Sequence, residues 1–150
     1  MWPSDRSGGF TLLEILLVMV LIGVSAGLVF VAVGGGAFQS ERRRLLEDFT
    51  GALRDARTRG LLSGRPVFFV IDGEGRTYGA GRRRPFPAEV QVEGDGVVEA
   101  GGGVYGILFY PDGSSSGGRL DLRWAGGKVD RVAVDPLLGL VTLRAAEEGP

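Results

Sequence analysis

The chain has 150 residues and a formal net charge of -1. This length leaves room for one modest folded domain, and the charge is too small to draw the protein to nucleic acid or anionic lipid by a long-range field. The absence of Cys and His excludes disulfides, thiol nucleophiles, imidazole bases and most transition-metal sites. The 27 Gly and 7 Pro indicate many turns, and therefore a region of short β-strands.

An almost uninterrupted apolar run occupies residues 10–38, and Glu14 is its only charged residue. A helix over residues 10–33 would be roughly 36 Å long at about 1.5 Å per residue, which exceeds the roughly 30 Å hydrocarbon core of a bilayer. A buried core helix is the alternative, but such a helix usually carries a polar stripe and this run has none. The sequence therefore predicts a membrane-spanning helix over residues 10–38.

Two kinds of export segment begin with such a run. An ordinary secretory signal has an apolar stretch of about 7 to 15 residues followed by a small-residue cleavage site, and Ala32, Val33 and Gly34 imitate that site. The apolar run of this chain is longer than such a stretch. The other kind of segment is cleaved before its apolar run, which then stays on the mature protein.

The residues that precede and begin the apolar run resemble the class III signal of type IV pilins and type II secretion pseudopilins. They read Ser7-Gly8-Gly9-Phe10-Thr11-Leu12-Leu13-Glu14-Ile15. The resemblance implies that residues 1–9 are a prepilin leader, that a prepilin peptidase cuts after Gly9, and that Phe10 becomes the methylated mature N-terminus. It also places Glu14 at the fifth mature position, which implies a role for Glu14 in assembly.

The Glu14 carboxylate has two physical interpretations. An ionised carboxylate near hydrocarbon costs several kcal/mol unless it is paired, and the new α-amino group at Phe10 is a suitable cation, from the same chain or from a neighbouring subunit. The alternative is a capping box, because Thr11 and Glu14 have the T-x-x-E spacing that satisfies amide donors at a helix N-terminus. Both can hold, and the leader before the helix favours the pairing role.

Glycines are expected to modify the helix further along. Gly23 and Gly27 have the G-x-x-x-G spacing that lets a second helix approach closely. Gly34, Gly35 and Gly36 together would cost a helix about 3 kcal/mol relative to alanine. The sequence therefore predicts a flexible or locally melted point at these three residues.

Residues 39–63 are predicted to continue the helix in amphipathic form. Apolar residues recur there at steps of three and four, while charged residues mostly occupy the other face. The apolar face consists of Leu45, Leu46, Phe49, Ala52, Leu53, Ala56 and Gly60. The charged residues are Arg42, Arg43, Arg44, Glu47, Asp48, Arg54, Asp55 and Arg57. One side of this helix is therefore expected to lie on a sheet.

Residues 64–150 are predicted to form a β-rich globular head. The apolar run at residues 67–71 is followed by a turn sequence at residues 72–75, which predicts a hairpin to Thr77 and Tyr78. A helix followed by antiparallel strands gives an α+β fold, with the long N-terminal helix packed on an antiparallel sheet.

Alternation of apolar and charged residues marks the later strands of the head. Leu120, Leu122 and Trp124 have the period of a half-buried strand. Val132 and Val134 have the same alternating spacing and predict a further strand. A turn is expected at residues 135–139, and residues 140–143 are expected to form the last strand. Residues 107–118 resemble the C-terminal part of GspH/FimT-type minor pilins, in which an apolar strand leads into a Pro-x-Gly turn and a small-residue loop.

Several residue groups imitate active or binding sites but have simpler explanations. The serines at residues 114–116 have no His to complete a catalytic triad and are expected to form a polar turn. Asp72, Glu74 and Asp112 could recruit calcium, but they lack the full ligand loop of an EF-hand. The glycines at residues 101–103 lack the strand and helix of a phosphate loop, and are expected to form a flexible connector. No enzyme activity, cofactor or metal site is expected.

Arg82, Arg83 and Arg84 form the one basic patch of interest, and Phe86 follows them. Three guanidinium groups beside an aromatic ring could bind phosphates and stack on a base. A solvated surface loop is the simpler interpretation. These three arginines are the candidate contact with DNA.

The resemblance implies a minor pilin or pseudopilin, a structural subunit of a type IV pilus or a type II secretion pseudopilus. Its expected partners are the prepilin peptidase and methyltransferase, other pilins or pseudopilins, and the bacterial inner membrane, with the head in the periplasm. Such a subunit serves pilus assembly, twitching motility, DNA uptake or protein secretion. The alternatives are a DNA-binding minor pilin and an exported protein with an ordinary cleaved signal.

Overall fold

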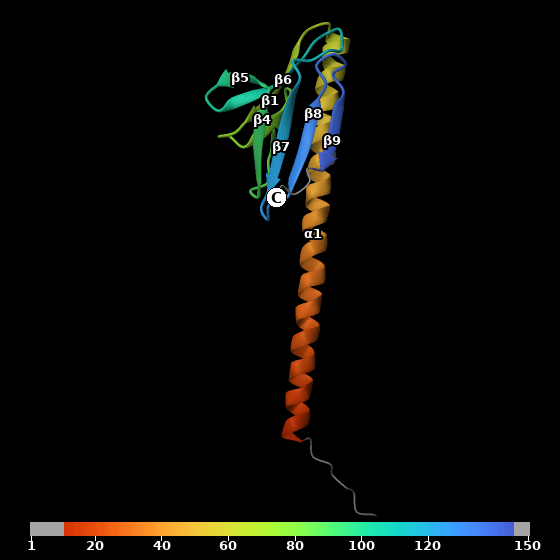
Figure 1. The fold of residues 1–150 in the computed structure, drawn as a ribbon, viewed down its shortest axis with the longest axis vertical. Coiled ribbons are helices and arrows are strands. Elements are labelled where there is room, and N and C mark those ends of the chain that lie inside the picture. Colours follow the sequence, from red (N-terminus) through yellow and green to blue (C-terminus); the bar gives the residue numbers. More distant parts are fainter. Residues whose placement is uncertain (1–10, 146–150) are drawn as a thin grey trace, which may run out of the picture. The chain divides into compact units, whose positions relative to one another are not determined.

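The computed structural model describes the backbone of residues 11–145, and the side chains of residues 11–27 and 39–144. The chain divides into two compact units, Met1–Arg44 and Leu45–Pro150. One helix, α1 (Leu12–Ser63), contributes residues to both units, and all the strands belong to the second (Figure 1). The two units are described separately below.

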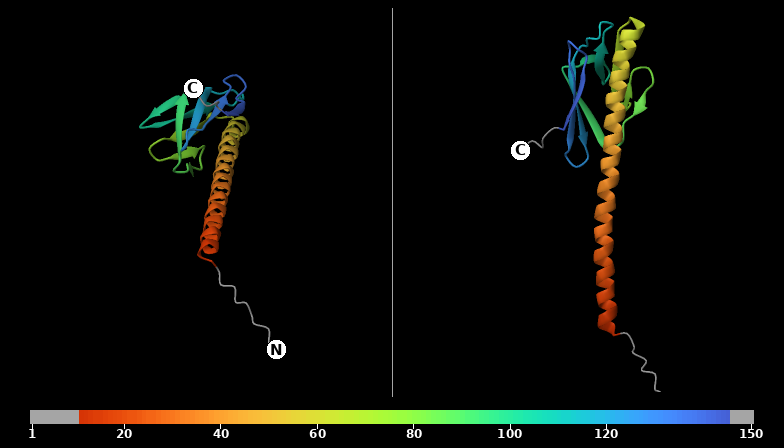
Figure 2. Two further views of the ribbon diagram at one scale, coloured as in Figure 1. Left: turned by 60° about the horizontal axis from the view of Figure 1, so that its bottom comes forward. Right: turned by 90° about the vertical axis from the view of Figure 1, so that its right-hand side faces the viewer.

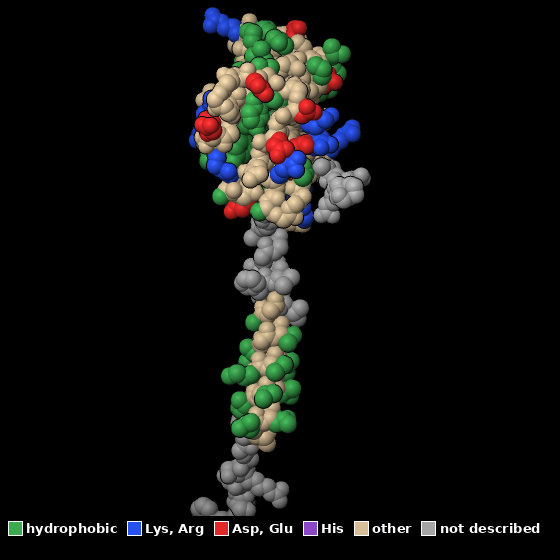
Figure 3. Space-filling view, turned by 60° about the vertical axis from the view of Figure 1, so that its left-hand side comes forward, with side chains coloured by type: hydrophobic (Ala, Val, Ile, Leu, Met, Phe, Trp, Pro, Cys, Tyr) green, Lys and Arg blue, Asp and Glu red, His purple; other side chains and the backbone are tan. Residues whose placement is uncertain are grey.

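The described part of the first unit is the N-terminal part of α1. Hydrophobic side chains cover its turns on all visible sides (Figure 3), and Leu12, at 86% exposure, is the most exposed of them. The helical backbone continues through Gly34, Gly35 and Gly36, so the helix is not locally melted there, and the flexibility expected at these residues stays a prediction. Helical residues lie on both sides of the three glycines, and adding a residue to an existing helix costs far less than starting one.

Within the described residues, no helix is both long enough and apolar enough to cross a membrane. The span predicted over residues 10–38 also includes Phe10 and the side chains of residues 28–38, which lie outside the described part of the chain. The membrane span therefore stays a prediction.

In the second unit, the C-terminal part of α1 buries one face. Its buried apolar side chains are Leu45, Leu46, Phe49, Ala52, Leu53 and Ala56, which confirms the predicted stripe. The helix ends at Ser63. Gly64 follows with a φ of 63°, and its N–H donates to the Gly60 carbonyl at 3.1 Å. A glycine with positive φ directly after the last helical residue is a common way to end a helix.

Two antiparallel sheets form the rest of the head (Figures 1 and 2). The first has the strand order β3-β2-β1-β6-β5, and the second has the order β4-β7-β8-β9. The first sheet contains β1 (Val67–Asp72), β2 (Thr77–Gly79), β3 (Arg84–Pro85), β5 (Val98–Gly101) and β6 (Val104–Phe109). The second contains β4 (Val90–Asp95), β7 (Gly118–Trp124), β8 (Val129–Val134) and β9 (Val141–Ala145). The predicted α+β fold is confirmed.

The core of the head combines the helix stripe with the inner faces of both sheets. An aromatic cluster joins α1 to the first sheet, with the Phe49 ring centroid 5.6 Å from that of Phe69 and 5.0 Å from that of Tyr78. Phe86 completes the cluster, with its centroid 4.6 Å from that of Tyr78. The second sheet contributes side chains that alternate along β7 and β8, and these are Leu120, Leu122, Trp124, Val132 and Val134.

The predicted turns of the head are present. Asp72 accepts a hydrogen bond from the Gly75 N–H at 2.7 Å in the β1–β2 hairpin. Asp135 accepts from the N–H groups of Leu137 and Leu138 at 2.9 and 2.8 Å in the β8–β9 turn. The glycines at residues 101–103 all have positive φ and join β5 to β6. They form the predicted connector as a tight turn, because left-handed backbone conformations are open to glycine at no steric cost.

Candidate functional site

The start of α1 carries the predicted assembly residue. The Glu14 N–H donates to the Thr11 carbonyl at 3.0 Å and to the Thr11 hydroxyl at 3.2 Å. These bonds are the threonine half of the capping arrangement. The Glu14 side chain is exposed. Gly9 and Phe10 lie outside the described residues, so the processing site and the pairing of Glu14 with the Phe10 amine remain predictions.

The structure does not bring Arg82, Arg83 and Arg84 together as one free patch. Arg84 forms an ion pair with Asp48 of α1, and its guanidinium also donates to the Asp48 carbonyl at 3.4 Å. Arg82 and Arg83 are exposed. Phe86 is buried in the aromatic cluster, with 9% of its surface accessible, so its ring faces the core and not a nucleic-acid base.

Asp48 is a residue whose role the sequence pattern missed. The Tyr78 hydroxyl donates to one of its carboxylate oxygens at 2.6 Å, while Arg84 binds the other. The Tyr78 hydrogen bond, and to a smaller extent Arg84, lower the pKa of Asp48 against the opposing effect of burial. Burial, followed by the Asp48 hydrogen bond, raises the pKa of Tyr78 well above its usual range. This trio ties α1 to strands β2 and β3.

Two arginines of α1 have roles that the sequence pattern did not indicate. Arg57, on the charged face, donates to the Gly113 carbonyl at 3.1 Å. Arg59 donates to the Ala80 carbonyl at 2.5 Å. Long side chains at the border of an apolar stripe can lie along it while their charged ends reach polar groups. That border position was the only available signal in the sequence.

The serines at residues 114–116 form a polar loop that directly follows the turn at residues 111–113, and Ser115 makes an isolated bridge with Phe109. Both the N–H and the hydroxyl of Ser114 donate to one Asp112 oxygen, at 3.0 and 2.6 Å, and these bonds lower the pKa of Asp112. The Ser115 hydroxyl donates to the Asp135 carbonyl at 2.9 Å. These contacts hold the loop against the β8–β9 turn, and each serine already has a structural partner.

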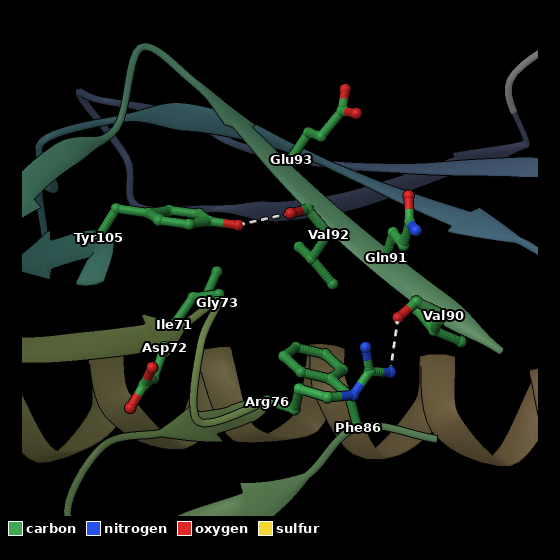
Figure 4. Close-up of a pocket in the computed structure, with 10 residues that line it drawn as sticks. All are labelled: Ile71, Asp72, Gly73, Arg76, Phe86, Val90, Gln91, Val92, Glu93 and Tyr105. Atoms are coloured by element: carbon green, nitrogen blue, oxygen red, sulfur yellow. Dashed lines mark hydrogen bonds between the residues drawn. The ribbon is translucent and has the colours of Figure 1, made fainter. Parts of the chain in front are cut away.

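An open groove of about 340 Å³ lies beside strand β4, with Ile71, Phe86 and Val92 among its lining residues (Figure 4). The Arg76 guanidinium donates to the Val90 carbonyl at 3.0 Å. The Tyr105 hydroxyl donates to the Val92 carbonyl at 2.7 Å. Both polar groups are therefore engaged by the β4 backbone. In the described residues, no group of three or more acidic side chains converges as a metal site.

Known proteins with similar sequences identify the family. Residues 4–30 match the Prokaryotic N-terminal methylation motif. Type II secretion system protein H of Xanthomonas campestris pv. campestris is 35% identical over 125 residues, which covers 77% of this chain and 74% of the relative. The chain belongs to the type II secretion system protein H family. The family's representative in Klebsiella pneumoniae is 33% identical over 131 residues, which covers 82% of this chain and 72% of that protein.

A solved structure of the same class has a similar fold. The minor pseudopilin EpsH from the type 2 secretion system of Vibrio cholerae matches with a TM-score of 0.53 at 16% identity, covering 66% of this chain and 92% of that chain. This match confirms the fold prediction, and the motif and the sequence relatives confirm the resemblance to GspH-type minor pilins. The expected function as a structural subunit of the pilin and pseudopilin class is also confirmed, and the family name points to type II secretion rather than to a type IV pilus.

Proposed function

We propose that this chain is a minor pseudopilin of a type II secretion pseudopilus, made as a precursor and stored in the bacterial inner membrane. The match of residues 4–30 to the methylation motif is the observation that carries this proposal. A prepilin peptidase removes residues 1–9 by cutting after Gly9, and Phe10 is then methylated. The apolar segment at residues 10–38 stays on the mature protein, and the head lies in the periplasm.

In this proposal Glu14 directs entry of the subunit into the filament. Its carboxylate is the only charge in the apolar segment, and an unpaired charge in hydrocarbon is costly. The methylated amine of Phe10, in the same chain or in a neighbouring subunit, supplies the opposite charge. A subunit is therefore stabilised when it docks at a position where its carboxylate meets an amine. Lipid and the helices of other pseudopilins both satisfy the remaining apolar surface.

Intact-mass measurement of the full chain from membranes of cells that contain a prepilin peptidase tests the processing. The expected mass is that of residues 10–150 plus one methyl group. Gly9→Leu should leave the precursor uncut. Cleavage near Gly34, or recovery of the protein without its apolar segment, would contradict the proposal.

Glu14→Val separates assembly from processing. This variant should be cleaved and methylated like the wild type but should be recovered less often in filaments, because it has no carboxylate to meet the amine. Leu13→Val, one residue away and without a charge change, is the matched control. Normal incorporation of Glu14→Val would contradict the role assigned to Glu14.

DNA is the alternative partner, and its candidate contacts are now the exposed Arg82 and Arg83. Their replacement by Ala should reduce salt-dependent binding of duplex DNA if the head is a DNA receptor. The engagement of Arg84 by Asp48 and the burial of Phe86 favour the structural role.

A further inference from the structure

The two sheets of the head have four edge strands, and three of them are protected against pairing with another chain. Strand β3 has two residues and contains Pro85. Strand β5 has four residues, and its register with β6 shifts between Glu99 and Gly101. Short length, proline and irregular register are the usual means by which proteins prevent edge-to-edge association.

Strand β4 is protected by side chains. Arg76 and Tyr105 donate hydrogen bonds to the carbonyls of Val90 and Val92, at 3.0 and 2.7 Å (Figure 4). These carbonyls point away from β7, so a new strand would have to displace both donors. β4 also carries Glu93 and Asp95.

Among the described residues, the fourth edge, β9, lacks the proline, the register shift and the side-chain hydrogen bonds that protect the other three, and Arg144 is its one charged residue. Its five residues, VTLRA, contain neither proline nor glycine. The strand keeps unbroken antiparallel register with β8, from Asp130 opposite Ala145 to Val134 opposite Val141. In the described part of the chain no strand follows β9 in its sheet. β9 is therefore the edge best suited to accept another strand.

The hydrogen-bond pattern tells which β9 groups are available. The Asp135 N–H donates to the Leu140 carbonyl at 3.0 Å, so these two residues form a hydrogen-bonded pair. Hydrogen-bonded and non-hydrogen-bonded pairs alternate along an antiparallel ladder. The N–H and C=O groups of Val141 and Leu143 consequently point away from β8, toward the open edge.

The apolar face of the second sheet also continues to this edge without cover. Leu143 lies opposite Val132, so the two side chains share a face. Val132 is fully buried, whereas Leu143 is 44% exposed. A strand added beside β9 would place its own apolar side chain next to Leu143 and reduce that exposure.

Charges on the opposite face of the sheet indicate the chemistry of the added strand. Three arginines there are each paired with a carboxylate on a neighbouring strand. Arg119 pairs with Asp95 at 3.2 Å, Arg123 with Glu93 at 2.9 Å, and Arg131 with Asp121 through two bonds of 2.8 Å.

Arg144 on β9 differs from these three arginines. It is exposed and lies directly opposite Arg131, and like charges at opposite positions of a strand pair are unfavourable. No described carboxylate pairs with it. A carboxylate on a strand beyond β9 would continue the pattern of the other three arginines.

We propose that β9 is a docking edge that accepts an extended acidic segment of a partner protein as an additional antiparallel strand. The partner's backbone pairs with the outward groups of Val141 and Leu143, its apolar residues cover Leu143, and its carboxylate binds Arg144. This interaction goes beyond the proposed assembly role of Glu14. It does not require cleavage at Gly9, because every residue involved belongs to the head.

The test uses the full chain in detergent and a capped peptide of sequence Val-Glu-Val-Thr-Val-Glu-Val, with the lysine version Val-Lys-Val-Thr-Val-Lys-Val as the matched probe. Hydrogen exchange should show that the amides of Val141 and Leu143 exchange rapidly alone and are protected by the acidic peptide. The acidic peptide should bind at least about fivefold more tightly than the lysine peptide.

Two variants and one control assign the effect to β9. Arg144→Glu should reverse the preference between the two peptides. Leu143→Pro removes an outward N–H that the sheet does not use, so it should weaken peptide binding by about tenfold or more without loss of the fold. Arg119→Glu changes an arginine on the same face but away from the edge, and should leave peptide binding unchanged. If Leu143→Pro unfolds the head, the peptide preference of Arg144→Glu tests the proposal by itself.

Other outcomes would overturn the proposal. Absence of protection, equal binding of both peptides, or protection of Val92 in β4 would show that β9 is not an acidic-strand site. Protection of β9 in the chain alone that disappears on dilution would assign the edge to a second copy. Protection that disappears in the double variant Glu147→Gln, Glu148→Gln would assign it to the chain's own C-terminal residues. Failure of processing at Gly9 would affect none of these measurements.

Discussion

The two parts of helix α1 differ in the exposure of their apolar side chains. In the first unit, Leu16 and Leu17 are 61% and 55% exposed. In the second unit, Phe49 and Leu53 are fully buried. Apolar surface of the second part is covered by the sheets of the same chain, whereas the first part has no cover from the described residues. The second unit therefore buries its own apolar side chains, and we expect lipid or other helices to cover the first part of the helix.

Phe49→Ala should have the largest effect on this comparison. The Phe49 ring contacts Phe69, Tyr78 and Phe86, and its removal leaves a cavity in the core. We expect the free energy of unfolding of the head to fall by about 3–5 kcal/mol, measured by urea denaturation of the full chain in detergent with circular dichroism. A loss below about 1 kcal/mol would show that the head does not depend on this part of α1.

Asp48→Asn should have a smaller effect that depends on pH. The Tyr78 hydrogen bond is the main reason why the pKa of Asp48 is lower than usual in the folded state. A lowered carboxyl pKa stabilises the fold above the unfolded-state pKa, and this stabilisation is lost as the pH falls through the folded-state pKa. Because the Asp48 side chain is 47% exposed, we expect the variant to lose less than about 1 kcal/mol at neutral pH.

Urea denaturation of wild type and Asp48→Asn between about pH 7 and pH 2 measures this difference. The two stabilities should converge as the pH falls below about 4, the range in which an ordinary aspartate is protonated. Some pH dependence should remain in the variant, because Arg131 lowers the pKa of Asp121 in the same direction. A constant gap at every pH would contradict the assigned role of the Asp48 charge.

Leu17→Ala should have the smallest effect on the stability of the head. Leu17 belongs to the first unit, and its side chain has no cover to lose. The change in the free energy of unfolding should stay within about 0.5 kcal/mol, as for most exposed positions. Leu17→Ala is measured by the same urea denaturation and is the matched control for Phe49→Ala. A loss as large as that of Phe49→Ala would show that the two parts of the helix are not independent.

Periodicity in the sequence predicts the elements of the head because it reflects which side chains are buried. The stripe that includes Phe49 and the alternation through Leu120, Leu122 and Trp124 are both present. The turn residues Asp72 and Asp135 act locally, through hydrogen bonds to amides two or three residues away. Such short-range bonds can be inferred from the sequence, since they need no knowledge of the fold.

Most of the errors arise where residues distant in the sequence meet, and one arises within the helix itself. Arg84 seemed part of a basic patch, but the fold brings it to Asp48, 36 residues earlier. Phe86 follows three arginines and yet enters the core. The glycines at residues 34–36 stay helical because their neighbours extend the helix through them. The open edge at β9 depends on strand order, which no local pattern specifies.

The burial of Trp124 gives the head its own optical probe. Its indole N–H donates to Asp130 at 2.9 Å, and only 4% of the residue is exposed. The chain has 2 Trp, and the other, Trp2, lies within the proposed leader. After removal of residues 1–9, tryptophan emission would come from the second sheet alone, so a red shift would report unfolding of the head without a contribution from the first part of α1.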